Sequence, residues 1–456
     1  MTPEYAEFLA SKAPVAPMTG IEPPPLSSHL MTQQAVTVDF ALRAGRAGAF
    51  LDTGLGKTGV ELEFCRHAGE ATNGRSLICA PLAVAPQIAR EGKRFGYDAR
   101  VIRSEDDARE GINIVNYDRL HLIDAGAYGG TALDESGIIK NFTGKTTRTL
   151  IDLFAQTRFK LSATATPAPN DHMELGQHAE FLSVMQSSEM LMRWFTADQT
   201  AMGRYRLKTH GEKHFWDWMA SWSRMAMMPS DLGGSDEGFV LPPLEVVPHF
   251  VDDPDASAAG LLGLEKLSAT EIHATKRRTA ALRAALGVEL AMSDAEPCVI
   301  WVDTDYEADA VKALCPEIVE VRGSQPAAVK ERNLEAFADG TVTKLLTKPS
   351  IAGFGLNWQH CNHPVYVGRS FSYEAWYQTV RRFWRFGQTR PVRADLVVAD
   401  GERSIGRVID RKAGDHRHMQ EAMVAAMKRA LGRAASLKVA YEPRHRAPLP
   451  EWMRAA

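Results

Sequence analysis

The sequence LDTGLGKTG at residues 51–59 lies between a short apolar run and a segment with helical periodicity. Residues 49–51 have the pattern of the end of a buried strand, and residues 60–64 that of a following helix. This order puts Gly54 and Gly56 in the connecting turn, where glycine lets backbone N–H groups close around phosphate oxygens. The stretch therefore predicts an α/β fold with a phosphate-binding loop at the start of a helix.

Two side chains directly after the glycines fit the same ligand. Lys57 offers a positive charge to the outer phosphates of a nucleoside triphosphate, and the Thr58 hydroxyl can bind Mg²⁺. The loop departs from the pattern G-x-x-x-x-G-K-[ST], because Leu51 stands where the first glycine would be. The loop residues that we expect to contact ATP are Thr53, Gly54, Leu55, Gly56, Lys57 and Thr58.

Bulk composition is that of a globular protein without a strong overall charge. The chain has 456 residues, of which 45% are hydrophobic and 24% charged, and its formal net charge is −3. Two or three domains are expected at this length, and nucleic acid would have to bind to local basic surface. The five cysteines form no C-x-x-C pair, which argues against zinc and disulfides. With no signal peptide or membrane span expected, the prediction is a cytoplasmic protein.

Short apolar strands alternate with helical patterns over residues 29–180 and again over residues 286–402. Such alternation predicts parallel sheets covered by helices, so the expected fold class is α/β with two tandem domains. Residues 1–28 are rich in proline and should form an extended arm. Residues 181–285 are expected to form a helical insertion and linker, and residues 403–456 a basic helical tail.

Two adjacent acids, Asp134 and Glu135, follow a short apolar run in the first domain. A phosphate-loop ATPase needs a carboxylate at a strand end to hold magnesium and a second group to orient the attacking water. We assign Asp134 to the magnesium ion and Glu135 to the water. An acid pair of this kind could also be a solvated helix start, which would be the better interpretation of the pair in isolation.

Arg382 and Arg385 lie three residues apart in a segment with helical character near the end of the second domain. On a helix they would share a face, and two neighbouring guanidinium groups repel each other unless an anion lies beside them. A γ-phosphate between the domains would be that anion. Surface arginines with packed stems are the alternative.

In this order, these pieces resemble the motifs of the superfamily 2 helicases and translocases, most closely the Swi/Snf-type branch and its compact bacterial and phage relatives. The resemblance covers roughly residues 30–400. The matching motifs are Gln34, DTGLGKT (52–58), Ala80-Pro81-Leu82 with Pro86-Gln87, Asn116-Tyr117, Asp134-Glu135-Ser136 with Lys140-Asn141, SATATPAPND (162–171), Gly323-Ser324 with Arg332 and Phe337, AGFGLN (352–357) and QTVRRFWRFGQ (378–388).

The resemblance implies two RecA-like lobes that hold ATP and Mg²⁺ between them in a bacterial or phage-infected cell. It also implies that Gln34 reads the adenine, that Gly355 lines the cleft from the second lobe, and that Arg385 is the arginine that reaches the γ-phosphate. The nucleic-acid backbone contacts of the family correspond to Pro81, Asn116 and Ser350.

The implied function is a DNA-dependent ATPase that moves along DNA, expected to be duplex and bound without sequence preference. A strand-separating helicase on forked or single-stranded substrates remains open. So does an ATP-binding scaffold with weak hydrolysis, because Ser136-Gly137 replaces the Ala-His of many relatives. The basic tail could grip phosphates or form a solvated helix face. Four tryptophans of the insertion could stack on bases, although large side chains at helical spacing more often pack in a core: Trp194, Trp216, Trp218 and Trp222.

Overall fold

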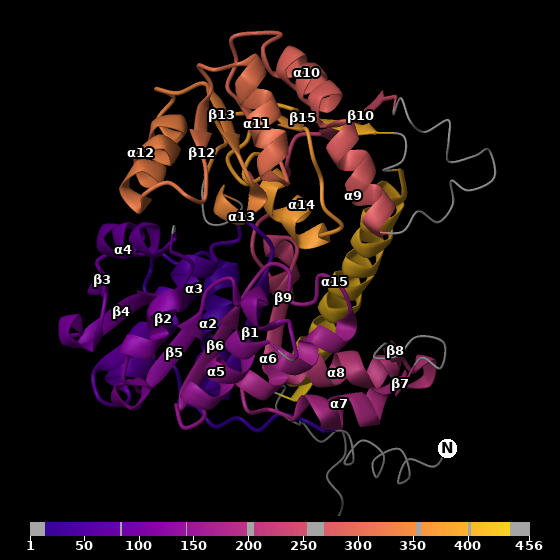
Figure 1. Cartoon of the computed structure of the whole chain (residues 1–456). Coiled ribbons are helices and arrows are strands. Elements are labelled where there is room, and N and C mark those ends of the chain that lie inside the picture. The colour runs from indigo at the N-terminus through magenta and orange to yellow at the C-terminus, as the bar shows by residue number, and fades with distance from the viewer. Residues whose placement is uncertain are drawn as a thin grey trace, which may run out of the picture.

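The computed structural model describes residues 14–82, 84–142, 144–197, 205–252, 269–352, 357–399 and 403–437. They form two lobes, each built on a parallel β-sheet that is covered by helices (Figure 1). The predicted fold class, two tandem α/β lobes with a helical C-terminal part, is confirmed. None of the helices within these ranges has both the length and the apolar character needed to cross a membrane.

Lobe 1 contains a seven-stranded sheet with the strand order β3-β4-β2-β5-β6-β1-β9. Its β1 strand reads Arg-Ala-Gly-Ala-Phe-Leu and is buried at every position but the first, as expected of a strand covered on both faces. Its strands are β1 (Arg46–Leu51), β2 (Arg75–Ala80), β3 (Ala99–Val101), β4 (Gly111–Asn116), β5 (Gly130–Leu133), β6 (Phe159–Ala163) and β9 (Ser223–Ala226). Its helices are α2 (Thr32–Ala44), α3 (Lys57–Glu70), α4 (Ala85–Arg94), α5 (Lys145–Leu153), α6 (Leu175–Phe181), α7 (Ser187–Trp194) and α8 (Glu212–Trp222).

Lobe 2 contains a six-stranded sheet with the strand order β10-β15-β14-β11-β13-β12, in which neighbouring strands are also parallel. Its strands are β10 (Leu244–Val251), β11 (Cys298–Trp301), β12 (Val319–Val321), β13 (Lys344–Thr347), β14 (His363–Tyr366) and β15 (Val392–Ala399). Its helices are α9 (Ala269–Arg278), α10 (Ala280–Ala291), α11 (Asp305–Leu314), α12 (Ala327–Ala338), α13 (Pro349–Ala352) and α14 (Tyr373–Val380).

The structure differs from the expected organisation over residues 181–285. Besides helices, this segment supplies β9 to the first sheet, β10 to the second sheet, and an antiparallel hairpin of β7 (Phe195–Ala197) and β8 (Tyr205–Leu207). The sequence of β9, Ser-Arg-Met-Ala, has neither an alternating pattern nor an apolar run, so it gives no strand signal. Trp218 and Trp222 are 2% and 0% exposed, which confirms the packing interpretation of the aromatic residues.

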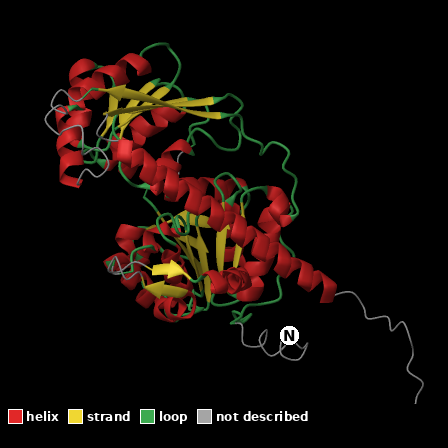
Figure 2. Cartoon of the chain, turned by 90° about the vertical axis from the view of Figure 1, so that its right-hand side faces the viewer, coloured by secondary structure: helices red, strands yellow, loops and turns green. Residues whose placement is uncertain are grey.

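The C-terminal helix α15 (Arg403–Leu437) connects the two lobes. Near its start, Ile405 and Ile409 pack against α14 of lobe 2. Further along, Met419, Met423 and Met427 are buried in the core of lobe 1. Figures 1 and 2 show the helix crossing the boundary between the lobes.

Two basic residues of α15 are paired with acids of lobe 1. Lys428 lies 2.8 Å from Asp231, and Arg429 lies 2.7 Å from Asp217. These two charges therefore have partners within the protein.

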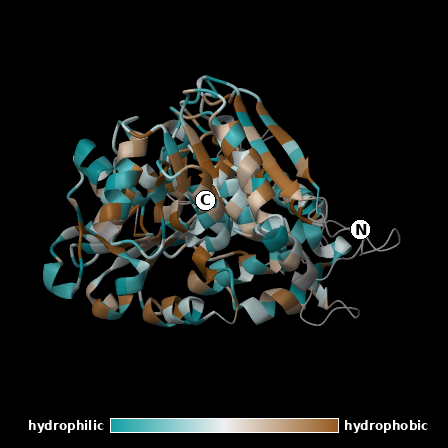
Figure 3. Cartoon of the chain, turned by 45° about the horizontal axis from the view of Figure 1, so that its top comes forward, coloured by the Kyte–Doolittle hydropathy of each residue, from teal (hydrophilic) through white to brown (hydrophobic). Residues whose placement is uncertain are grey.

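The loops that follow the strands of both sheets meet at the boundary between the lobes. In Figure 3, the strands are largely brown, whereas the helices around them carry both teal and brown segments. In lobe 1, the turn after β1 leads into α3, and in lobe 2, α13 and α14 lie at the edge that faces lobe 1 (Figure 1). The carboxyl ends of parallel strands are the usual place for a ligand in such sheets.

Candidate nucleotide-binding site

A cavity of about 210 Å³ between the lobes brings together most of the predicted site residues. Lobe 1 contributes the loop after β1 and the acids after β5, and lobe 2 contributes the two arginines. The lining residues are Thr53, Gly54, Gly56, Lys57, Thr58, Val84, Gln87, Glu91, Asp134, Glu135, Asn357, Arg382 and Arg385.

The phosphate-binding loop depends on its glycines. Gly54 and Gly56 have φ angles of 92° and 84°, a region that strains residues with a side chain. A Cβ atom on Gly56 would also lie 2.2 Å from the Nε2 atom of Gln34. The turn ends where α3 begins at Lys57, whose Nζ atom donates a hydrogen bond to the Leu51 carbonyl at 3.1 Å. The loop therefore presents the N-terminus of α3 and one ammonium group to the cavity.

Gln34 lies beside the loop and holds its backbone. Its Nε2 atom donates to the Gly56 carbonyl at 2.9 Å, and its Oε1 atom accepts from the Met31 N–H at 2.8 Å. Gln34 does not line the cavity, so its predicted contact with adenine stays a prediction. Leu55 is 2% exposed and packs in the lobe 1 core, and Gly355 lies outside the described residues.

Three carboxyl groups are crowded on the lobe 1 side of the site. Burial, and then the charge of Glu135, raise the pKa of Asp134 to about 7, while Lys57 acts in the opposite direction. Behind them, Glu61 of α3 is fully buried, and burial together with the Asp134 charge raises its pKa. A cation beside Asp134 would offset the burial and the repulsion that raise its pKa, and would favour the ionised carboxylate.

The donor set fits Mg²⁺ bound together with a nucleotide. No cluster of three or more His, Cys, Asp or Glu side chains in the described part of the chain is arranged to hold a metal. Magnesium in nucleotide sites is instead held by one or two protein oxygens, the phosphates and water. Thr58 and Asp134 supply such hard oxygen ligands and line the same cavity.

Glu135 has an unusual backbone conformation for its residue type. Its φ and ψ angles are both 49°, in the left-handed region, which costs a non-glycine residue roughly 1–2 kcal/mol. Strain of this kind is concentrated at functional sites. In this conformation the Glu135 side chain lines the cavity, and its Oε2 atom lies 3.5 Å from the Nε2 atom of Gln378 in lobe 2.

The two arginines reach the cavity from turns. Because α14 ends at Val380, Arg382 and Arg385 do not share one helix face as predicted. The backbone tightens there, with the Arg382 N–H bonded to the Thr379 carbonyl at 3.2 Å, while Phe383 is buried in the core of lobe 2. Both arginines nevertheless line the cavity.

Arg382 is a buried cation, and Arg385 beside it is half-buried. Arg382 is 2% exposed and donates two hydrogen bonds to Gln378, of 3.1 Å to its carbonyl and 3.0 Å to its Oε1 atom. Burial lowers the pKa of Arg382 to about 9 and that of Arg385 to about 10, so both remain charged at neutral pH. Desolvated cations of this kind stabilise an anion that enters the cavity.

Sequence reasoning missed several residues of the interface between the lobes. Asp52, directly before the predicted loop residues, forms an ion pair of 2.7 Å with Arg381 and accepts a hydrogen bond from Tyr377. Lys140 of lobe 1 also pairs with Glu374 of lobe 2. Asp52, Lys140 and Arg381 stand within recognised motifs, but only the relative position of the lobes shows the pairing.

The residues predicted to contact nucleic acid lie at or just after the carboxyl ends of strands. Pro81 follows β2, and Asn116 ends β4, which pairs with β2 so that Asn116 lies opposite Ala80. Ser350 is exposed on α13 of lobe 2, at the edge that faces lobe 1 (Figure 1). These three assignments stay predictions.

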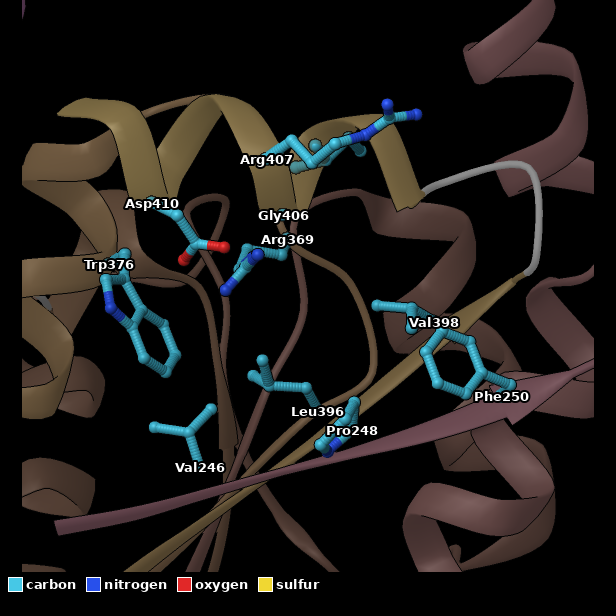
Figure 4. Close-up of a pocket in the computed structure, with 11 residues that line it drawn as sticks. Val246, Pro248, Phe250, Arg369, Trp376, Leu396, Val398, Gly406, Arg407 and Asp410 are labelled. Carbon is cyan, nitrogen blue, oxygen red and sulfur yellow. The ribbon is translucent and has the colours of Figure 1, made fainter. Parts of the chain in front are cut away.

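A second cavity, of about 580 Å³, lies outside this site, on lobe 2. It is bounded by β10, β15 and the start of α15, and Figure 4 shows its apolar floor with Arg369, Arg407 and Asp410 among the lining residues. None of the predicted site residues lines it.

Of the comparisons with known proteins, only the one with solved structures found matches. No family model and no curated protein matches the chain. Among solved structures, the chain is similar to the Sulfolobus solfataricus SWI2/SNF2 ATPase core in complex with dsDNA. The two are 15% identical with a TM-score of 0.40, and the match covers 88% of this chain and 96% of that chain.

Proposed function

We propose that this protein binds ATP between its lobes, hydrolyses it, and uses the cycle to move along DNA, preferentially duplex DNA. The observation that carries the hydrolytic part is the shared cavity. Lys57, Asp134 and Glu135 line it from lobe 1, and Arg382 and Arg385 line it from lobe 2. A triphosphate with its outer phosphates beside Lys57 would have the arginines on its other side.

Each side chain has a role in phosphoryl transfer that follows from its chemistry. Lys57 and the α3 N-terminus bind the phosphates, and Glu135 orients the attacking water. Thr58 and Asp134 would hold Mg²⁺, which would supply positive charge against the phosphates. Arg385 stabilises the charge that develops on the γ-phosphate, while Arg382 is held in place by Gln378.

Movement follows from the position of the site between two lobes. ATP that contacts both lobes favours the closed arrangement, and hydrolysis removes that preference. If each lobe grips a phosphodiester backbone, repeated closing and opening moves the protein along the strand. The assignment of the polymer to DNA rests on the motif resemblance, and the predicted contacts Pro81, Asn116 and Ser350 lie on both lobes.

The test is the rate of ATP hydrolysis with no polymer, single-stranded DNA, duplex DNA and duplex RNA. We expect the largest stimulation with duplex DNA. Lys57→Ala and Glu135→Gln should abolish the stimulated rate, and Arg385→Ala should lower kcat by about 10³-fold or more. A wild-type rate equal to that of the Lys57→Ala protein would contradict hydrolysis and favour an ATP-binding scaffold. Greater stimulation by single strands would favour strand separation, and greater stimulation by duplex RNA would contradict the assignment to DNA.

A further inference from the structure

Asp52 connects the phosphate-binding loop to lobe 2 through both of its carboxylate oxygens. Its Oδ1 atom accepts a hydrogen bond from the backbone N–H of Thr53 at 2.6 Å and another from the hydroxyl of Tyr377. Its Oδ2 atom lies 2.7 Å from the Nη2 atom of Arg381. One side chain thus holds the first turn of the loop and two residues of the opposite lobe.

The contact is largely buried, although Asp52 and Arg381 also line a cavity of about 300 Å³. The Asp52 and Arg381 side chains are 10% and 12% exposed, and the Arg381 guanidinium lies over the rings of Trp384 and Tyr377 at 4.6 Å and 5.2 Å. From α15, the ring of His416, which is 3% exposed, packs edge-on against Tyr377. Water is therefore largely excluded from the ion pair, which strengthens the attraction between its charges.

A solvent-exposed ion pair between the lobes provides a contrast. Arg90 of α4 lies 4.0 Å from Glu335 of α12, and these side chains are 69% and 72% exposed. A solvated pair at that distance contributes little or nothing measurable. The two pairs span the same boundary but differ in burial and in separation, so Arg90–Glu335 serves as the control pair.

We propose that Asp52, Tyr377 and Arg381 form an interlobe latch that holds the lobes together before nucleotide binds and thereby positions Arg382 and Arg385 over the phosphate-binding loop. The role in positioning rests on the proposed function, whereas the closure itself does not. Arg381 directly precedes Arg382 in the chain. When the Arg381 side chain is held by Asp52, the turn that carries Arg382 and Arg385 is held in position as well. The latch residues are positioning residues, because they bind each other and not the phosphates.

The latch predicts how nucleotide affinity depends on lobe closure. If the closed arrangement is the one that binds ATP, the apparent dissociation constant rises in inverse proportion to the closed fraction. Loss of the latch should therefore raise the KM for ATP while leaving kcat at saturating ATP nearly unchanged. Loss of a group that acts only in the transition state should lower kcat instead.

The first experiment measures closure without nucleotide. Cysteines introduced at the exposed positions Lys93 and Leu314, one on each lobe, carry a fluorophore pair, and the five native cysteines are all buried. We expect a short distance between the labels in the otherwise unchanged protein. Tyr377→Phe, which removes one hydroxyl and keeps the ring, and Arg381→Gln should shift the population to longer distances. Glu335→Gln is the control and should leave the distance unchanged.

The outcomes separate the latch from the proposed function. An unchanged distance in folded Tyr377→Phe and Arg381→Gln proteins would overturn the latch, whatever the rate of hydrolysis. Longer distances in these variants, with no hydrolysis by the wild type, would uphold the latch and contradict the proposed function.

The second experiment tests the positioning role in an active enzyme. We expect Tyr377→Phe and Arg381→Gln to raise the KM for ATP by about tenfold, with kcat changed by less than about threefold. Because the three residues act as a unit, Asp52→Asn combined with Arg381→Gln should be no worse than the more affected single variant. A fall in kcat as large as that of Arg385→Ala, at unchanged KM, would contradict the positioning role.

Discussion

His178 of α6 is a buried histidine with a hydrogen-bond partner at each ring nitrogen. Its Nε2 atom lies 3.0 Å from the Pro167 carbonyl, which can only accept, and its Nδ1 atom lies 2.7 Å from the Ser162 hydroxyl. The Pro167 carbonyl requires a proton on Nε2, and burial favours the neutral ring, in which the Ser162 hydroxyl donates to Nδ1. Burial lowers the pKa of this histidine to about 4. The ring thus links the SATATP segment to α6, and burial disfavours its charged form.

The shift in the pKa of His178 predicts a loss of stability in acid. The folded protein keeps the ring neutral down to about pH 4, whereas the unfolded chain binds a proton near pH 6.5. Because the unfolded state binds more protons between these values, the contribution is full above pH 6.5 and declines as the pH falls toward 4, by about 3 kcal/mol in all. Urea unfolding of wild type and His178→Gln across this range should show a shallower pH dependence in the variant. Parallel curves would contradict the assignment.

At the scale of single residues, the sequence predicts those site residues that belong to short contiguous motifs. Lys57, Thr58, Asp134 and Glu135 follow strands whose ends share one edge of a parallel sheet, so their convergence follows from the strand pattern. The contact of Asp52 with Arg381 joins positions 329 residues apart and depends on how the lobes face each other. No local pattern encodes that orientation.

At the scale of elements, the sequence of α15 predicts a helix but not its packing partner. Met419, Met423 and Met427 are spaced by four residues and predict one apolar helix face, but not the surface that it covers. The structure buries this face in lobe 1, far along the chain from the strands of that lobe. Likewise β9 joins the first sheet next to β1, although its four residues carry no strand signal.

The packing of α15 predicts a loss of stability when its apolar face is cut back. Met423 is 2% exposed, so Met423→Ala removes buried atoms and should cost about 2–5 kcal/mol. Glu421→Ala, on the exposed side of the same helix, should change stability by no more than about 0.5 kcal/mol. Thermal unfolding of the two variants measures this contrast. Equal midpoints would show that the helix does not pack against lobe 1 in solution.

At the scale of the whole molecule, the cavity is completed within one chain, because lobe 1 supplies the loop and the acids and lobe 2 the arginines. The order of the motifs already indicates two halves of one site. The sequence alone could not establish that both halves belong to the same copy, since an arginine can also come from a neighbouring molecule.

This arrangement predicts that two inactive variants cannot restore each other. An equimolar mixture of Lys57→Ala and Arg385→Ala should hydrolyse ATP no faster than the better of the two alone, because neither chain contains an intact cavity. The measurement is the rate of the mixture across a range of protein concentrations, with duplex DNA present. Recovery that grows with concentration would show that the arginine is supplied by a second copy.

The path of α15 also has a consequence for synthesis on the ribosome. The last strand of the first sheet ends at Ala226, but three methionines of the same core lie at positions 419, 423 and 427. At about 5–20 residues per second, translation needs roughly 10–40 s to reach them. During that interval the surface of lobe 1 that these methionines cover is exposed. Chaperones can therefore bind to it while the chain is still being synthesised.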